Sequence, residues 1–380
     1  MSLAAEDTLA VLPQQTQLVD FRRNFPPPTP LTKEALNSAL VELQNSPNLT
    51  DDLRFPRYNG SETDRVAGAM WLKQRFKSDV SEERIVLSNG TQSTALMVLA
   101  QIARPGGVLL TEELTYPAMK PLARLLGIQV HGVDMDADGL RPDALASVAR
   151  KTGAKVFHCI PTFQNPTTAI MPAERRQEIA EVARMHDLQI LEDDIYGVLL
   201  EDGPPPVASY APERTWYMLG LSKSLSLQLR ITYLLTPEGA VPSQYFWPAT
   251  MTTNWMPAPL PTEVATKWVL DGTAARLLSS VRRETAERHL IANDVLRGIQ
   301  LRSHPQCYHL WVDLPSGWSS DAFAERARRI GIFVSSTRSF AVSEASAPNK
   351  VRLGLGVPND PGVLKVSLEA LRDLMSDEPY

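Results

Sequence analysis

The 380-residue sequence has few of the features that would place it outside the ordinary globular class. It contains only two cysteines, Cys159 and Cys307, in apolar contexts and without a partner motif. Both are therefore expected to be buried free thiols in a reducing cytoplasm. No apolar run reaches the length of a membrane span, and the N-terminus lacks a basic-plus-apolar signal. We predict no membrane association, and we assign no metal site.

Positive charge is also scarce. The 38 Lys and Arg residues are outnumbered by 43 Asp and Glu residues, which gives a formal net charge of −5. No basic run exceeds what a solvated helix face carries, and no recognition helix is evident. We therefore expect this chain alone to bind no nucleic acid.

The length and a hydrophobic fraction of 43% suit two domains. Residues 1–60 are expected to form an N-terminal arm and a helix that pack with a small domain. In that helix Leu36, Leu40 and Leu43 would provide the apolar face. Residues 61–262 would form a large domain, and residues 263–380 a long linking helix with the small C-terminal domain. The segment 51–61 is predicted to be a loop.

Strands and helices alternate regularly from residue 84 onward. Short apolar strands are expected at 85–87, 108–110, 128–133, 155–160, 188–191 and 216–221. Helices lie between them, including 141–151 and 173–186. This pattern predicts an α/β fold whose mainly parallel sheet is covered by helices on both faces. Beyond residue 261, a long helix at 273–298 and short strands mixed with helices predict a smaller α+β domain.

One lysine follows directly on the apolar strand at 216–221. A lysine in such a place is costly as a bare ammonium ion, because burial disfavours the charged form. It therefore reaches water, pairs with an acid, or serves as a neutral nucleophile toward a carbonyl. Taken alone, Lys223 fits best a strand-end lysine that reaches solvent.

Other polar residues follow the neighbouring strands, where ligands bind in open parallel sheets. The turn 88–92 places a glycine before the free N–H groups of a helix, which favours an anion such as phosphate. Asn165 precedes a proline in a restricted loop, and Asp193 lies three residues before Tyr196. Each of these motifs is weak alone, since turns and solvated caps look alike.

Together, these residues meet the needs of pyridoxal 5′-phosphate. Lys223 would form a Schiff base, and Asp193 would hold the ring nitrogen protonated. The turn 88–92 and Arg230 would hold the phosphate. The two side chains expected at the ring oxygen are Asn165 and Tyr196. Five separate loops that converge on one cofactor are unlike a chance assembly, so the nucleophilic interpretation of Lys223 now prevails.

Residues 84–235 resemble the large domain of fold-type I pyridoxal-phosphate aminotransferases of class I/II. The matching motifs are Asn89-Gly90-Thr91-Gln92, Thr115-Tyr116-Pro117, Gln164-Asn165-Pro166-Thr167, Glu192-Asp193-Asp194-Ile195-Tyr196, Ser222-Lys223 through Arg230, and, near the C-terminus, Val351-Arg352-Leu353-Gly354. The resemblance implies an internal aldimine on catalytic Lys223. It also implies a set of cofactor-binding residues, namely Gly90, Thr91, Gln92, Tyr116, Asn165, Asp193, Tyr196, Ser222, Lys223 and Arg230.

The resemblance further implies amino transfer between an α-amino acid and a 2-oxo acid. Lys223 would carry the proton as general base and acid, and Tyr116 would stack on the cofactor ring. Arg352 would bind the substrate carboxylate bidentately, with Asn165 beside it. A homodimer is implied, in which Tyr58 or its neighbourhood reaches across to the partner's site.

Within that family the sequence is most similar to the aminotransferase-like domain of MocR-type regulators of the GntR superfamily. The motifs that carry this likeness are Asp20-Phe21-Arg22-Arg23-Asn24, Leu114-Thr115-Tyr116-Pro117, Gln164-Asn165-Pro166 and Arg175-Arg176. Those regulators carry a winged helix ahead of this point, for which the chain has no room before Asp20. DNA binding would need that absent N-terminal domain.

Several functions therefore stay open. The chain is expected to be an aminotransferase-type domain derived from a regulator, with weak or partial transamination. The alternatives are an effector module that senses an amino acid or amine without turnover, and a lyase, decarboxylase or racemase on the same scaffold. Three departures from the family pattern predict an altered phosphate site: Gly220 stands where a hydroxyl is frequent, Leu227-Gln228 replace Pro-Gly, and Thr232 replaces glycine.

Overall fold

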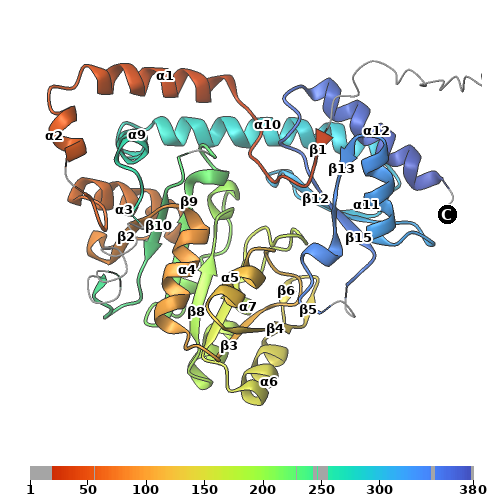
Figure 1. Cartoon of the computed structure of the whole chain (residues 1–380), viewed down its shortest axis with the longest axis horizontal. Helices are drawn as coiled ribbons and strands as arrows, with labels where there is room; N and C mark the ends of the chain where they lie inside the picture. Colours follow the sequence, from red (N-terminus) through yellow and green to blue (C-terminus); the bar gives the residue numbers. More distant parts are fainter. Residues whose placement is uncertain are drawn as a thin grey trace, which may run out of the picture.

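The computed structural model describes residues 19–54, 56–227, 229–242, 246, 256–343 and 347–377. They form a large α/β body and a smaller α+β body, joined by the long helix α10 (Thr273–Val295) (Figure 1). Helix α1 (Pro30–Gln44) runs beside α10, and both also contact α9 (Pro259–Leu270). No helix in the described ranges is long and apolar enough to cross a membrane.

The large body is organised around a seven-stranded sheet. In spatial order its strands are β2 (Ile85–Ser88), β10 (Thr232–Leu235), β9 (Thr215–Gly220), β8 (Gln189–Asp193), β7 (Val156–Cys159), β3 (Val108–Glu112) and β4 (Gln129–Val133). The five strands from β9 to β4 pair in parallel, whereas β10 is antiparallel to both of its neighbours. The predicted α/β class with a mainly parallel sheet is therefore confirmed.

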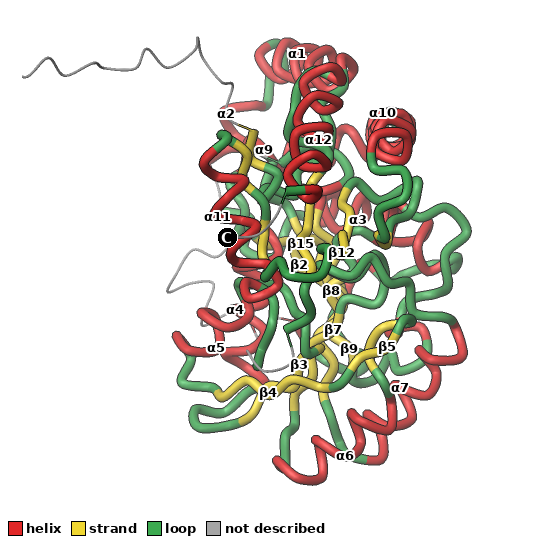
Figure 2. The backbone as a smooth tube through the Cα atoms, turned by 90° about the vertical axis from the view of Figure 1, so that its right-hand side faces the viewer, coloured by secondary structure: helices red, strands yellow, loops and turns green. Residues whose placement is uncertain are grey.

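Helices cover both faces of this sheet, as Figure 2 shows. They are α3 (Glu62–Phe76), α4 (Gly90–Ile102), α5 (Met119–Leu125), α6 (Pro142–Thr152) and α7 (Ala173–Met185). Strand β9 shows why two covers are needed, because its side chains alternate between two apolar clusters. Trp216 and Met218 join the cluster under α4 and α5, while Tyr217 and Leu219 join the cluster under α3 and α9.

The small body packs its helices on a four-stranded antiparallel sheet. That sheet comprises β11 (Leu301–Arg302), β12 (His309–Asp313), β15 (Lys350–Gly354) and β14 (Ser335–Ser336). Its helices are α11 (Ser320–Arg329) and α12 (Pro361–Ser376). A separate pair joins β1 (Val19–Asp20) to β13 (Ile332–Phe333), so the first described strand belongs to the C-terminal body. A short hairpin, β5 (Met135–Asp136) with β6 (Gly139–Leu140), lies at the rim of the large body.

Two local expectations were wrong, and one strand of the central sheet was missed. Strand β10 was not predicted, although all four of its residues are buried. The segment 51–61 is not wholly a loop, since α2 (Leu49–Arg54) extends into it. In α1 the buried residues are Ala35 and Ala39, whereas Leu36 and Leu40 are exposed. The free, buried state of Cys159 and Cys307 agrees with the prediction.

Candidate active site

The carboxyl ends of the parallel strands open onto a cavity of about 640 Å³ between the two bodies. Because β10 runs antiparallel, its first residue lies at this same edge of the sheet. We call this space the central cavity. Its lining includes Arg22, Asn24, Phe25, Gly90, Thr91, Gln92, Tyr116, Asn165, Asp193, Tyr196, Ser222, Lys223, Leu227, Arg230, Ser335, Phe340 and Arg352.

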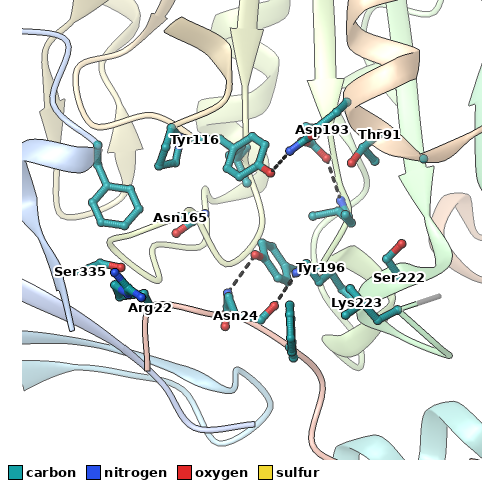
Figure 3. Close-up of a pocket in the computed structure, with 18 of the residues that line it drawn as sticks. Arg22, Asn24, Thr91, Tyr116, Asn165, Asp193, Tyr196, Ser222, Lys223 and Ser335 are labelled. Atoms are coloured by element: carbon teal, nitrogen blue, oxygen red, sulfur yellow. Dashed lines mark hydrogen bonds between the residues drawn. The ribbon is translucent and has the colours of Figure 1, made fainter. Parts of the chain in front are cut away.

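Lys223 ends a short 3-10 helix that directly follows β9. Its Nζ donates to the main-chain carbonyl of Asn24 (Figure 3). The same Nζ lies 5.7 Å from the ring centroid of Phe25. Burial lowers the pKa of Lys223 to about 7, and the nearby cations Arg352 and Arg230 act in the same direction. A large share of this amine is therefore neutral and nucleophilic at neutral pH.

Two adjacent acids at the end of β8 face different surroundings. Asp193 lines the central cavity, and its Oδ1 accepts from the main-chain N–H of Ile195 over 3.3 Å. Burial is the main cause that raises the pKa of Asp193 to about 7. Asp194 instead accepts from Arg75 Nε over 2.7 Å and from Tyr217 Oη over 3.0 Å. Only Asp193 is thus placed to meet a ligand in the cavity.

The opposite wall of the cavity carries an arginine from the small body. Arg352, on β15, donates from Nη1 to Asn165 Oδ1 over 2.9 Å and from Nη2 to the main-chain carbonyl of Arg22. Its guanidinium lies 5.1 Å from the ring centroid of Phe340. The Nε of Arg352 is buried and has no partner among the described residues. The Arg352 guanidinium lines the central cavity, and its N–H donors suit an anionic ligand.

A third part of the cavity gathers groups that suit an anion. Gly90, with φ +82°, begins α4, so the first N–H groups of this helix open onto the cavity at Thr91 and Gln92. Gln92 Nε2 donates to Tyr116 Oη over 2.6 Å, which ties this turn to the aromatic wall. Arg230 lines the same end in a left-handed conformation with φ +55°. Helix N–H groups and a guanidinium together favour a phosphate-sized anion.

The structure brings all but one of the predicted site residues to the central cavity. The exception is Tyr58, which is half-buried between α2 and α3 and does not line this cavity. Of the positions that depart from the family pattern, Leu227 lines the cavity, Thr232 is buried at the start of β10, and Gln228 lies outside the described residues.

Sequence reasoning missed the cavity residues of the N-terminal arm, defined here as residues 21–28. Asn24 was noticed only as part of a family-like run, with no role assigned, and Phe25 was not singled out at all. The arm has no periodic pattern, and its course depends on glycines far along the chain. A Cβ on Gly354 would lie 2.5 Å from the carbonyl oxygen of Arg23. That dependence leaves no signal near Asn24 itself.

Comparisons with known proteins agree with this geometry. Residues 29–364 match the family model described as aminotransferase class I and II. The HTH-type transcriptional regulator YdeF of Bacillus subtilis is 30% identical over 343 residues, which cover 89% of this chain and 73% of the regulator. Aromatic-amino-acid aminotransferase 1 of Thermococcus litoralis is 26% identical over 234 residues, 60% of this chain and 56% of that enzyme.

The fold also matches solved structures. An archaeal alanine:glyoxylate aminotransferase superposes with a TM-score of 0.83 at 24% identity, covering 94% of this chain and 90% of the other. At that identity the likeness concerns the fold. The predicted resemblance to both aminotransferases and HTH-type regulators is confirmed by these matches.

Proposed function

The chain belongs to the class I and II aminotransferases, a family that depends on pyridoxal 5′-phosphate, and we propose that it transfers an amino group between an α-amino acid and a 2-oxo acid. The observation that carries the proposal is the amine of Lys223. It is held at a pKa of about 7 in one cavity with Asp193 and Arg352. A neutral amine, a carboxyl group and a carboxylate-binding arginine are the minimum set for this chemistry.

The side chains around the cavity fit pyridoxal 5′-phosphate. The start of α4, Ser222 and Arg230 would hold the phosphate, because they supply N–H, hydroxyl and guanidinium donors. Asp193 would keep the ring nitrogen protonated, and Tyr196 would donate to the ring oxygen. The aromatic ring of Tyr116 would cover one face of the cofactor.

When bound, the cofactor supplies an electron-withdrawing ring that stabilises negative charge on the substrate's α-carbon. Lys223 Nζ, near its pKa of about 7, is suited both to remove a proton at that carbon and to return it. Arg352 would bind the substrate carboxylate through parallel N–H donors. The packed arm above Lys223 would keep water from this part of the cavity.

Covalent trapping tests this proposal. Protein incubated with pyridoxal 5′-phosphate should show a visible absorption band, and borohydride should then fix the cofactor to the peptide that contains Lys223. The Lys223→Ala variant should lose both signals. A matched Lys155→Ala variant, altered at an exposed lysine, should keep them. Wild-type protein that stays colourless with excess cofactor would refute the proposal.

A second function is favoured by one specific observation, the match to an HTH-type regulator across 89% of this chain. A sensing module needs to bind an amino acid or amine and change shape, without repeated turnover. Multiple turnovers with some 2-oxo acid would favour the enzyme, whereas a single half-reaction would favour the sensor. Reading the native gene upstream of Asp20 for a continuing frame that encodes a basic helical domain separates the two independently.

We also infer that the protein works as a homodimer. Large apolar side chains are exposed on three neighbouring helices, with Leu40 at 42%, Met70 at 50% and Leu260 at 42% exposure. Contacts join α9 to both α1 and α3, so the three helices that carry these residues are neighbours. Tyr58, away from its own cavity, would then reach the partner's site. Sedimentation analysis tests this, and Met70→Glu should shift the equilibrium toward monomer.

A further inference from the structure

The N-terminal arm places one amide side chain among the chemical groups of the cavity. Asn24 is only 7% exposed, and its position is fixed by backbone packing on the small body. Gly354 N donates to the carbonyl of Phe21 over 2.8 Å. A Cβ on Gly356 would lie 1.9 Å from the carbonyl oxygen of Phe25, so only glycine admits the arm there. Asn24 is therefore held in a rigid frame.

The amide of Asn24 contacts two rings. Its Nδ2 lies 2.9 Å from Tyr196 Oη and 3.1 Å from His309 Nδ1, and Figure 3 shows the first of these contacts. The Oδ1 atom is buried and has no partner among the described residues. The side chain is thus anchored by its donors.

The neighbouring histidine fixes which end of the amide faces the rings. His309 Nε2 lies 3.4 Å from the main-chain carbonyl of Gln164, which can only accept. Burial lowers the pKa of His309 to about 3, so the neutral ring carries one proton, and that proton belongs on Nε2. His309 Nδ1 is then an acceptor that faces two donors, the Asn24 amide at 3.1 Å and the Cys307 thiol at 3.2 Å. The reversed amide would set an oxygen against that lone pair and would leave the NH₂ group unpaired.

This arrangement determines the direction of the Tyr196 hydroxyl. Because Asn24 donates to Tyr196 Oη, the phenolic proton is not used in that contact and remains available elsewhere. Tyr196 lines the central cavity. Building on the proposed cofactor, we propose that Asn24 is a positioning residue that directs the phenolic proton of Tyr196 toward the ring oxygen of the bound cofactor.

The proton shared between Lys223 Nζ and that ring oxygen should report the effect. Donation from Tyr196 stabilises negative charge on the ring oxygen, and this matters most once the shared proton has left. The directed hydroxyl therefore lowers the pH at which the proton is lost. The charged or titratable groups that face Lys223 are Asp193, Arg230, Arg352 and His309, and those that face Tyr196 are Tyr116, Cys307, Tyr308, His309 and Arg352.

The test is the pH midpoint of the visible absorption change in cofactor-loaded protein. Asn24→Ala removes the amide but keeps the carbonyl that Lys223 contacts. Asn24→Asp leaves only acceptors, which draw the phenolic proton away from the cavity. We expect both variants to raise the midpoint by about one pH unit, the worth of one hydrogen bond. Tyr196→Phe should raise it similarly, and Asn24→Ala should add nothing in that background.

The matched control is Arg23→Ala, which alters an exposed neighbour on the same arm and should leave the midpoint unchanged. Melting curves of the cofactor-free variants identify any that unfold, and Asn24→Ser provides a milder substitution that retains one donor. Additive shifts from Asn24→Ala and Tyr196→Phe would overturn the inference, because the effect must pass through the phenol.

A second experiment needs no cofactor. Nitrogen-15 spectra of the cofactor-free protein should show His309 protonated on Nε2, and the Nδ1–H tautomer would overturn the donor assignment of Asn24. If the wild type binds the cofactor and the Asn24 variants have the same pH midpoint as the wild type, this inference alone is overturned. Wild-type protein without a cofactor band would overturn both this inference and the proposed function.

Discussion

The Cγ2 methyl of Thr91 occupies the space in which a side chain on Gly220 would begin, since a Cβ there would lie 2.8 Å from this methyl. Thr232 Oγ1, at 3.2 Å, and Ile195 Cδ1, at 3.3 Å, close the remaining sides. The family-typical hydroxyl is therefore missing from a position that has no room for it. Glycine at position 220 therefore leaves room for Thr91, which packs against it from the first turn of α4.

Gly220→Ala should destabilise the cofactor-free protein by about 1–3 kcal/mol, the usual cost of overpacking. The backbone at Gly220, with φ −86° and ψ 140°, admits any residue, so the cost is steric alone. Thr91→Ser removes the opposing methyl and should restore most of the loss in the double variant. Urea unfolding measures all four proteins. Equal stability of Gly220→Ala and wild type would contradict the packing argument.

The two acids that end β8 should separate cleanly by stability and cofactor binding. Asp194→Asn leaves the buried guanidinium of Arg75 without its charge partner, which should cost about 3 kcal/mol or more. Asp193→Asn removes a carboxyl that burial already disfavours as an ion, so stability should change by less than about 1 kcal/mol. Cofactor affinity should fall for Asp193→Asn. Urea unfolding and fluorescence titration check this, and the reverse ranking would refute the assignment.

Glu112 should make the folded protein less stable as pH rises. Burial raises its pKa to about 8 from 4.5, so between those values the folded protein holds a proton that the unfolded chain has lost. The free energy of unfolding therefore falls across this window, by roughly a few kcal/mol at its upper end.

Glu112→Gln cannot ionise and should remove that decline. It should match the wild type near pH 5 and exceed it at pH 8, because one glutamine oxygen in the place of Glu112 Oε2 can still accept from both Ile160 and Gln164. Urea unfolding at several pH values measures the difference. The exposed Glu82→Gln serves as control and should follow the wild type. Parallel curves for Glu112→Gln and wild type would refute the buried, protonated state.

Arg352→Lys should weaken amino-acid binding, because an ammonium group cannot make the two parallel bonds of a guanidinium. The loss of one charge-assisted bond predicts a rise in apparent Kd of about 10- to 100-fold. Half-reactions with a panel of amino acids, followed by the cofactor spectrum, measure this. Arg329→Lys, at an exposed site on α11, is the matched control. An unchanged apparent Kd in Arg352→Lys would argue against a carboxylate-binding role.

The sequence predicted the strands that lead to the site because each is a short, continuous apolar run with an abrupt polar end. Strands β7, β8 and β9 were placed within two residues of their observed bounds. Lys223 and Asp193 follow such ends directly, so topology alone brings them to one edge of the sheet. Local pattern is enough when a residue's place is set by its own strand.

The same reasoning fails where a residue's place is set by distant partners. Strand β10 is only four residues long and follows the irregular segment after Lys223, so nothing near it signals pairing with both β2 and β9. Leu36 and Leu40 have helical spacing but lie on the outer face of α1, because Ala35 and Ala39 allow closer packing. The place of Asn24 depends on Gly354 and Gly356, over 300 positions away.

The pairing of β1 with β13 attaches the first described strand to the small body. The seven-stranded sheet of the large body takes no part in this pairing. The arm that follows β1 passes Lys223 before it reaches α1. A rotation of the small body relative to the large body would therefore move β1 and change the contact between the arm and Lys223 at the same time.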